Sequence, residues 1–245
     1  MGKVYLVGAG PGKKELLTLK AYELIQKADV ILRDELIGEV EDILKNVRAE
    51  IINVGKRSGK HSMKQEEINK LLVEMAKKYD IVVRLKGGDP FIFGRGGEEA
   101  EYLVDNGIEF EVVPGVTSAI AVPECACIPL THREFDPAVV FITGRETKRR
   151  LNWEALAKLN ATIVVLMGVE NLREICENLI KFGKDPNTPV AIIEKGFSAE
   201  ERILEGDLLN IAEKAKKEKI EPPAIIVIGE VVNLRQKLIR FFSPD

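Results

Sequence analysis

Short apolar runs alternate along this chain with longer stretches in which hydrophobic residues recur at helical spacing. In the first half, the apolar runs predict strands at 4–7, 30–32, 51–54, 81–85 and 110–113. The helical spacing predicts helices at about 15–27, along 68–79 and at 98–106. Alternation of this kind indicates an α/β fold with a parallel or mostly parallel sheet.

The pattern changes after the segment Pro114-Gly115-Val116-Thr117-Ser118-Ala119, which is typical of a hinge. Beyond it, the same rules predict strands at 139–143, 163–167, 190–194, 202–205 and 224–229, and helices along 172–180 and 208–219. The sequence therefore predicts two α/β domains, 1–114 and 115–245.

The run from Arg84 to Glu99 is the most distinctive stretch, because a strand enters it, a helix leaves it, and glycines crowd the turn between. Pro90 is expected to hold Asp89 extended, with its carboxylate pointing away from the turn. In open α/β sheets, ligands bind beyond the carboxyl ends of strands. The run therefore predicts a ligand floor, meaning a loop whose main chain lies directly against a bound ligand. The alternative is a glycine-rich connection without a ligand.

A second glycine loop, Gly8-Ala9-Gly10-Pro11-Gly12, follows the first predicted strand. With Asp34 after the second strand it suggests a dinucleotide site and a nicotinamide-dependent oxidoreductase. Two details argue against this: Lys13 stands where the third glycine is needed, and Pro11 lacks an N–H for a pyrophosphate. A ligand without phosphates, such as S-adenosylmethionine, fits this loop better.

Composition excludes several classes of function. The net charge of −3 gives no overall basic field for nucleic acid, and no apolar run is long enough to span a bilayer. The chain starts directly with a strand pattern, so a cytoplasmic protein is expected. Two histidines and a C-x-C pair predict no metal site. Cys125, Cys127 and Cys176 are expected to be buried free thiols.

Four motifs together resemble one family. They are Val7-Gly8-Ala9-Gly10-Pro11-Gly12 with Leu16-Leu17-Thr18, the run Arg84–Glu99, Val113-Pro114-Gly115-Val116-Thr117-Ser118, and Ile128-Pro129-Leu130-Thr131-His132-Arg133. In this order they are similar to the uroporphyrinogen-III C-methyltransferases of the tetrapyrrole methylase superfamily, over essentially the whole chain. The chain is too short to carry the dehydrogenase–chelatase domain of siroheme-synthase fusions.

This resemblance implies a homodimeric two-domain α/β enzyme that binds S-adenosylmethionine in the cleft between its domains. It implies methylation of uroporphyrinogen III at C2 and then C7, which gives precorrin-1 and then precorrin-2, with S-adenosylhomocysteine as product. The cofactor-binding positions carried over are Pro11, Gly87, Gly88, Asp89, Ile92, Thr117, Ser118, Met167, Gly196 and Ala224. The catalytic candidates are Asp34 and Lys56.

Simpler roles remain open for several of these residues. Met167 can be core packing, Thr117 and Ser118 can cap the helix that follows them, and Asp34 can be a cap or turn residue. Arg33, Arg145 and the segment 197–202 depart from the family pattern. Methylases of later precorrins are the alternative within the superfamily.

A substrate with eight carboxylates needs local cations on a chain whose net charge is negative. Arginine suits this task, because its planar fork can hold a carboxylate through two hydrogen bonds. The candidates are Arg57, Arg95, Arg133 and Arg145, with Lys56 nearby, whereas Arg84 is expected to be spent on internal pairing. Lys148, Arg149 and Arg150 are interpreted as a solvated helix start.

Overall fold

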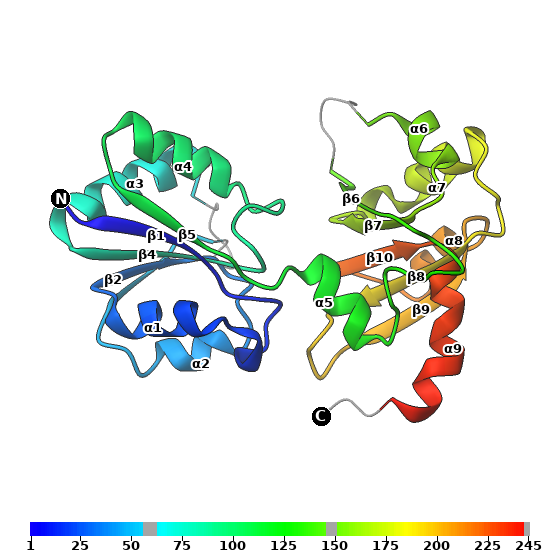
Figure 1. Ribbon diagram of the computed structural model, residues 1–245, viewed down its shortest axis with the longest axis horizontal. Coiled ribbons are helices and arrows are strands. Elements are labelled where there is room, and N and C mark those ends of the chain that lie inside the picture. Colours follow the sequence, from blue (N-terminus) through cyan, green and yellow to red (C-terminus); the bar gives the residue numbers. More distant parts are fainter. Residues whose placement is uncertain (56–62, 146–150, 243–245) are drawn as a thin grey trace. The chain divides into compact units, whose positions relative to one another are not determined.

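The computed structural model describes residues 1–55, 63–145 and 151–242, and the chain divides into two compact units, Met1–Thr117 and Ser118–Asp245 (Figure 1). Both units are α/β, as predicted. The sequence predicts the domain boundary after residue 114, three residues before the division between the units.

The first unit contains a five-stranded sheet with the order β3-β2-β4-β1-β5. Every pairing in it is parallel, which confirms the predicted parallel sheet. Its elements are β1 (Lys3–Gly8), α1 (Leu19–Lys27), β2 (Val30–Arg33), α2 (Val40–Leu44), β3 (Glu50–Asn53), α3 (Gln65–Lys78), β4 (Ile81–Lys86), α4 (Gly96–Asp105) and β5 (Phe110–Val113).

Helices cover both faces of this sheet, with α3 and α4 on one face and α1 and α2 on the other (Figure 1). Successive residues of a strand point to opposite faces, so alternate residues belong to two hydrophobic cores, one on each side of the sheet. Val4, Leu6 and Val82 pack against α3 and α4, whereas Val7 and Val83 pack against α1 and α2. Because both faces are buried, the strands are almost continuously apolar.

Helix α1 begins four residues later than predicted. The Thr18 side-chain oxygen accepts the backbone N–H of Ala21 at 3.2 Å and so caps the helix at Leu19, while Lys14–Leu16 forms a separate 3₁₀ turn. The sequence reading missed α2, because five residues are too few for helical periodicity to show.

The second unit contains a mixed sheet with the order β6-β7-β10-β8-β9, in which only β6 and β7 are parallel. An apolar run does not reveal strand direction, so the antiparallel pairings were not foreseen. The elements are α5 (Ser118–Cys125), β6 (Val139–Thr143), α6 (Trp153–Lys158), β7 (Thr162–Leu166), α7 (Leu172–Lys181), β8 (Pro189–Glu194), β9 (Arg202–Asp207), α8 (Ile211–Lys217), β10 (Ala224–Ile228) and α9 (Arg235–Leu238), with 3₁₀ turns at Val169–Asn171, Glu230–Leu234 and Ile239–Phe241.

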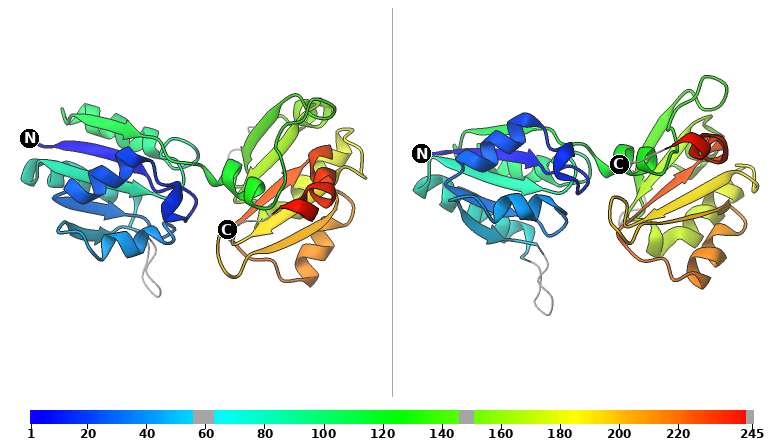
Figure 2. Two further views of the ribbon diagram at one scale, coloured as in Figure 1. Left: turned by 60° about the horizontal axis from the view of Figure 1, so that its bottom comes forward. Right: turned by 90° about the horizontal axis from the view of Figure 1, so that it is seen from below.

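Helices also lie on both faces of the second sheet (Figure 2). Leu156 of α6, Ile175 of α7 and Ile211 of α8 pack on one face, and Ala119 and Val122 of α5 pack on the other. Among the described residues, no helix is long and apolar enough to cross a membrane, and no group of acidic, cysteine or histidine side chains could hold a metal ion.

The expectation that all three cysteines are buried is correct for one of them. Cys176 lies in the core of the second unit, and burial raises the pKa of its thiol to about 11. Cys125 and Cys127 form no disulfide and are only partly buried, because they lie at and just beyond the end of α5.

Candidate active site

The carboxyl ends of β1, β2, β4 and β5 meet at one edge of the first sheet, because these strands are parallel. The loops that follow them carry the predicted residues of this unit, namely Pro11, Asp34, Gly87, Gly88, Asp89, Ile92, Arg95 and Thr117. The loop after β3 would carry Lys56 and Arg57, and both lie outside the described residues.

Main-chain hydrogen bonds join the two glycine loops to each other. The Gly88 N–H donates to the Gly10 carbonyl at 2.8 Å, and the Gly10 N–H donates to the Gly88 carbonyl at 3.2 Å. Gly88 has φ +66° and Gly10 φ +73°, backbone conformations that favour glycine. The two loops therefore form one continuous main-chain surface at the sheet edge.

Gly8 and Gly115 are required by close packing of the main chain. A methyl group on Gly8 would lie 2.5 Å from the Cα of Gly115 and 2.6 Å from the carbonyl oxygen of Gly88. Likewise, a methyl group on Gly87 would lie 2.5 Å from the carbonyl oxygen of Leu36. Much of the glycine pattern that predicted a ligand floor thus serves to bring loops together.

The prediction for the Asp89 carboxylate is wrong: it turns back onto its own loop. Its Oδ1 accepts the N–H groups of Phe91 at 2.8 Å and Ile92 at 3.2 Å, and its Oδ2 accepts the Gly115 N–H at 3.1 Å. Pro90 does not prevent this, because a short aspartate side chain readily caps the N–H groups that follow it. Asp89 therefore ties the loop after β4 to the loop after β5.

Asp34 lies just after β2 and joins a charge cluster that extends into the core. Its Oδ1 accepts a hydrogen bond from Arg84 Nη2 at 2.6 Å, which confirms that Arg84 is used in internal pairing. Arg84 Nε donates to Glu99 Oε1 at 3.0 Å, and Lys86 Nζ lies 3.1 Å from both Glu99 oxygens. Glu99 and Lys86 belong to α4 and β4, respectively.

Burial sets the electrostatics of this cluster. Burial opposes the charge of Arg84, but the carboxylates of Glu99 and Asp34 outweigh it and raise the arginine's pKa. Burial and the neighbouring Arg84 lower the pKa of Lys86, and Glu99 opposes that shift. Glu99 is fully buried, whereas the Asp34 side chain is 33% exposed, so the cluster connects the core to the surface of the sheet edge.

The loop from Phe91 to Arg95 presents apolar side chains beside the glycine surface. Ile92, a predicted cofactor contact, is 41% exposed. Phe93 and Arg95 adopt left-handed backbone angles, with φ of 52° and 60°. A non-glycine residue in this conformation stores strain, which is common at functional sites.

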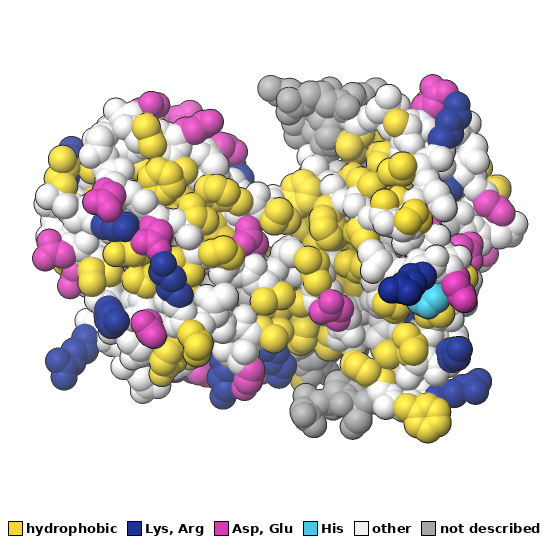
Figure 3. All heavy atoms as spheres, in the orientation of Figure 1, with side chains coloured by type: hydrophobic (Ala, Val, Ile, Leu, Met, Phe, Trp, Pro, Cys, Tyr) yellow, Lys and Arg dark blue, Asp and Glu magenta, His cyan; other side chains and the backbone are white. Residues whose placement is uncertain are grey.

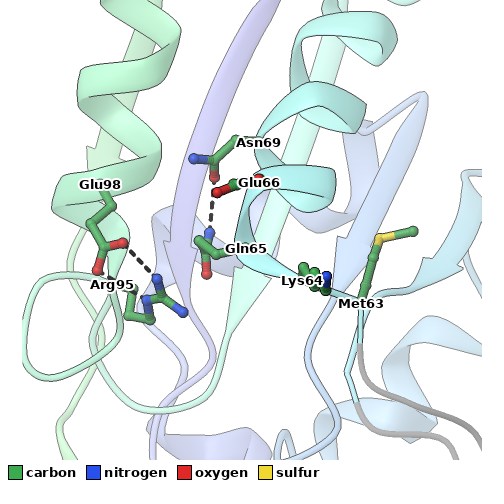
Figure 4. Close-up of a pocket in the computed structure, with 7 residues that line it drawn as sticks. All are labelled: Met63, Lys64, Gln65, Glu66, Asn69, Arg95 and Glu98. Atoms are coloured by element: carbon green, nitrogen blue, oxygen red, sulfur yellow. Dashed lines mark hydrogen bonds and ion pairs between the residues drawn. The ribbon is translucent and has the colours of Figure 1, made fainter. Parts of the chain in front are cut away.

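Arg95 lines an open hollow of about 520 Å³ between the first turns of α3 and α4 (Figure 4). Its guanidinium donates two hydrogen bonds to the Glu98 carboxylate, at 2.9 and 2.6 Å. In the close-up, Gln65 and Asn69 bond to each other within the same hollow. Arg95 therefore already has a carboxylate partner, which a substrate carboxylate would have to replace.

In the second unit, antiparallel pairing brings the start of β10 beside the ends of β7 and β8. Ala224 pairs with Glu194, and Ile225 pairs with Leu166. Met167 and Gly196 come directly after β7 and just beyond β8, so these predicted contacts gather at one edge of the second sheet. Met167 is 43% exposed and has φ 54°, which argues against the alternative of core packing.

The remaining predicted residues of the second unit have varied surroundings. A methyl group on Gly196 would lie 2.7 Å from a methyl of Val122 on α5. Ser118 is the first residue of α5, and Thr117 is buried just before it. Arg145, which follows β6, pairs with Glu170 at 2.9 Å. Arg133 is exposed between α5 and β6 and forms no ion pair with another described residue.

Sequence reasoning missed Glu99 and Lys86 as parts of the site. Arg84 and Lys86 stand two apart in an otherwise apolar strand, so both point to the same buried face. Buried cations need a partner, and Glu99 in the first turns of the next helix is the acid that this face can reach. That combination is the signal that could have identified the cluster.

A family model for the tetrapyrrole (corrin/porphyrin) methylases matches residues 3–212. The chain belongs to this family. The match argues against the nicotinamide interpretation of the first glycine loop. Close packing against Gly88 and Gly115 already explains glycines of that loop without a bound dinucleotide.

Individual relatives are similar over nearly the whole chain. An S-adenosyl-L-methionine-dependent uroporphyrinogen III methyltransferase of Methanosarcina barkeri is 57% identical, over 97% of this chain and 94% of its own. A uroporphyrinogen-III C-methyltransferase of Methanocaldococcus jannaschii is 53% identical, over 95% and 98%. The crystal structure of uroporphyrin-III C-methyltransferase from Thermus thermophilus with S-adenosylhomocysteine is 42% identical over 95% and 100%, with a TM-score of 0.82.

Proposed function

We propose that this protein is a uroporphyrinogen-III C-methyltransferase, which transfers methyl groups from S-adenosylmethionine to C2 and C7 of uroporphyrinogen III. Precorrin-2 would be the product, by way of precorrin-1. The strongest support is the 57% identity over nearly full length to a methyltransferase named for this substrate. The match covers 97% of this chain and 94% of the relative.

The residues of the first sheet edge fit a ligand such as S-adenosylmethionine. Gly87 and Gly88 carry no side chain, which close approach of a ligand to the main chain requires, and Pro11 removes one N–H that a phosphate would use. Ile92 offers an exposed apolar surface. Asp89 keeps acceptor capacity beyond its three main-chain bonds, because each carboxylate oxygen has two lone pairs. Thr117, Ser118, Met167, Gly196 and Ala224 complete the proposed contacts.

When bound, S-adenosylmethionine supplies an electrophilic methyl group on a sulfonium. A pyrrole carbon of the substrate forms the new C–C bond as the S–C bond breaks, and a proton must then leave to restore a neutral tetrapyrrole. We assign this proton to Asp34, and the support is that Arg84 holds Oδ1 while Oδ2 has no partner among the described residues. Lys56 is the second catalytic candidate. Most of the rate would come from positioning.

We further propose that arginines bind the substrate carboxylates. On the face shown in Figure 3, cationic and acidic side chains are interspersed, so no single basic field covers it. Local cations must then provide the affinity, and Arg133 is our first candidate because it has no described acidic partner. Arg95 and Arg145 would first have to leave Glu98 and Glu170. Arg57 completes this proposed set.

The direct test is incubation with uroporphyrinogen III and methyl-labelled S-adenosylmethionine under reducing conditions, followed by mass analysis. Two labelled methyl groups per tetrapyrrole are expected. Transfer to a later precorrin but not to uroporphyrinogen III would favour the alternative within the family. Titration with S-adenosylhomocysteine and with NAD, side by side, should show binding of the first alone.

We also propose a cytoplasmic homodimer. The last turns expose Leu238, Ile239, Phe241 and Phe242, an apolar surface of the kind that subunit interfaces cover. Light scattering on the purified protein should give twice the chain mass of 27.3 kDa. A monomer at micromolar concentration would contradict the dimer and leave the proposed reaction untouched.

A further inference from the structure

Glu99 lies in the core of the first unit, remote from solvent, yet it is only one side chain away from the catalytic candidate. It is fully buried, and Arg84 and Lys86 beside it are each 2% exposed. Buried charges are costly unless they are paired and hydrogen-bonded, so a group of three must have a specific arrangement. This arrangement ends at Asp34, the most exposed member of the cluster.

Every nitrogen of the Arg84 guanidinium has a partner. Nε donates to Glu99, Nη2 donates to Asp34, and Nη1 donates to the backbone carbonyls of Leu32 at 3.4 Å and Leu85 at 3.2 Å. These partners come from β2, β4, α4 and the loop after β2. A planar group held on all sides cannot rotate, so its Nη2 points in one direction and fixes Asp34 Oδ1.

Glu99 is itself held on the side away from Arg84. Lys86 Nζ lies 3.1 Å from both its oxygens, and Gln65 Nε2 donates to Oε1 at 3.2 Å. Gln65 also donates to Asn69 on α3. Residues of α3 and β4 therefore fix the orientation of the Glu99 carboxylate. Through its bond to Nε, Glu99 in turn fixes the orientation of Arg84.

The charges of the cluster balance only when Asp34 is included. Arg84 and Lys86 bring two positive charges, and Glu99 supplies one negative charge in the core. Asp34 supplies the second through its bond to Arg84. The same contact thus compensates a buried cation and orients the carboxylate at the sheet edge.

We propose that Glu99 is a positioning residue for methyl transfer: it aligns Arg84, and Arg84 directs the free oxygen of Asp34 towards the substrate. The inference rests on the proposed function and on the role of Asp34 in it. Loss of Glu99 would let the Arg84 guanidinium turn towards other acceptors, and Asp34 would lose its fixed orientation. An error of about 1 Å in such a group can lower turnover up to a hundredfold.

A double-mutant cycle tests this directly, with the kcat of methyl transfer measured for wild type, Glu99→Gln, Asp34→Asn and the double variant. Glu99→Gln should lower kcat about tenfold and change the S-adenosylmethionine KM less than twofold. In the Asp34→Asn background the same change should have no further effect, because there is no carboxylate left to direct. A purely structural loss would lower kcat equally in both backgrounds.

Three results would overturn the inference: an unchanged kcat in Glu99→Gln, an additive cycle, or an unchanged kcat in Asp34→Asn. Absence of methyl transfer by the wild type would instead refute the proposed function. If Glu99→Gln fails to fold, Arg84→Lys replaces it in the same cycle, since it keeps the charge but lacks the fork. Glu205→Gln, which removes the acid partner of Arg235 in the second unit, is the matched control and should keep full turnover.

Discussion

The two sheet edges that carry the candidate residues differ in what directly follows their strands. In the first unit, glycines allow loops to pack main chain against main chain, and a buried charge cluster lies behind them. In the second unit, Met167, Lys195 and Phe197 follow β7 and β8 with left-handed backbone angles at which glycine would be easier. At the first edge the left-handed residues Phe93 and Arg95 lie farther along the loop, beyond Gly87 and Gly88, whereas at the second edge Met167 and Lys195 come directly after their strands.

This difference indicates a division of labour. Main-chain groups and a fixed carboxylate suit the polar parts of a ligand and the handling of a proton. Exposed apolar side chains such as Met167 suit a flat aromatic group, because the thioether is polarizable and adaptable. The following predictions separate these roles.

The largest effect is expected where the first edge depends on main-chain packing. Gly8→Ala should lower the free energy of unfolding by about 3 kcal/mol, because its methyl group meets the backbone of Gly115 and Gly88, which cannot move aside easily. Urea denaturation measures the loss.

Gly97→Ala is the matched control for that experiment. A methyl group on Gly97 meets no described residue within 4 Å, and Gly97 lies in α4, so alanine should stabilise by about 0.5–1 kcal/mol. Equal stability of the two variants would show that close main-chain packing is not what requires glycine at the first edge.

Asp34→Asn tests the carboxylate of the same edge. If Asp34 accepts the proton, kcat should fall about a hundredfold while the affinity for S-adenosylhomocysteine changes little, since the lost interaction acts in the transition state. Single-turnover methyl transfer and calorimetry measure the two quantities. Loss of S-adenosylhomocysteine binding with unchanged kcat would assign Asp34 to the cofactor instead.

The first edge was also the more predictable of the two. Parallel strands put every following loop at the same edge, so strand order hardly matters for locating Asp34, Gly87 and Asp89 together. Two bonds of Asp89, to Phe91 and Ile92, are local ones that aspartate often makes in turns, but its bond to Gly115, 26 residues away along the chain, could not be predicted. Nor could the convergence of Ala224 with Met167, because it requires knowing that β10 runs antiparallel to β7.

Arg133→Met tests the proposed substrate contacts of the second unit. The KM for the tetrapyrrole should rise about tenfold, the size of one lost charged hydrogen bond, and the affinity for S-adenosylhomocysteine should stay the same. Arg145→Met should raise this KM less, because Arg145 must first leave Glu170. Both effects should shrink as salt rises. A larger effect at Arg145 would reverse the assignment.

The smallest effect concerns the strained position of the second edge. Met167→Ala and Met167→Gly both remove the thioether, and both should weaken S-adenosylhomocysteine binding about fivefold, a loss of about 1 kcal/mol.

The stabilities of these two variants should differ, since glycine accepts a φ of 54° and alanine does not. Met167→Gly should therefore be about 1 kcal/mol more stable to urea than Met167→Ala. Equal losses of affinity with unequal stabilities would show that the strain keeps a side chain in place for the ligand. If the affinity for S-adenosylhomocysteine instead followed stability, the ligand would require the backbone angle at position 167 and not the side chain. Main-chain geometry would then determine binding at both edges.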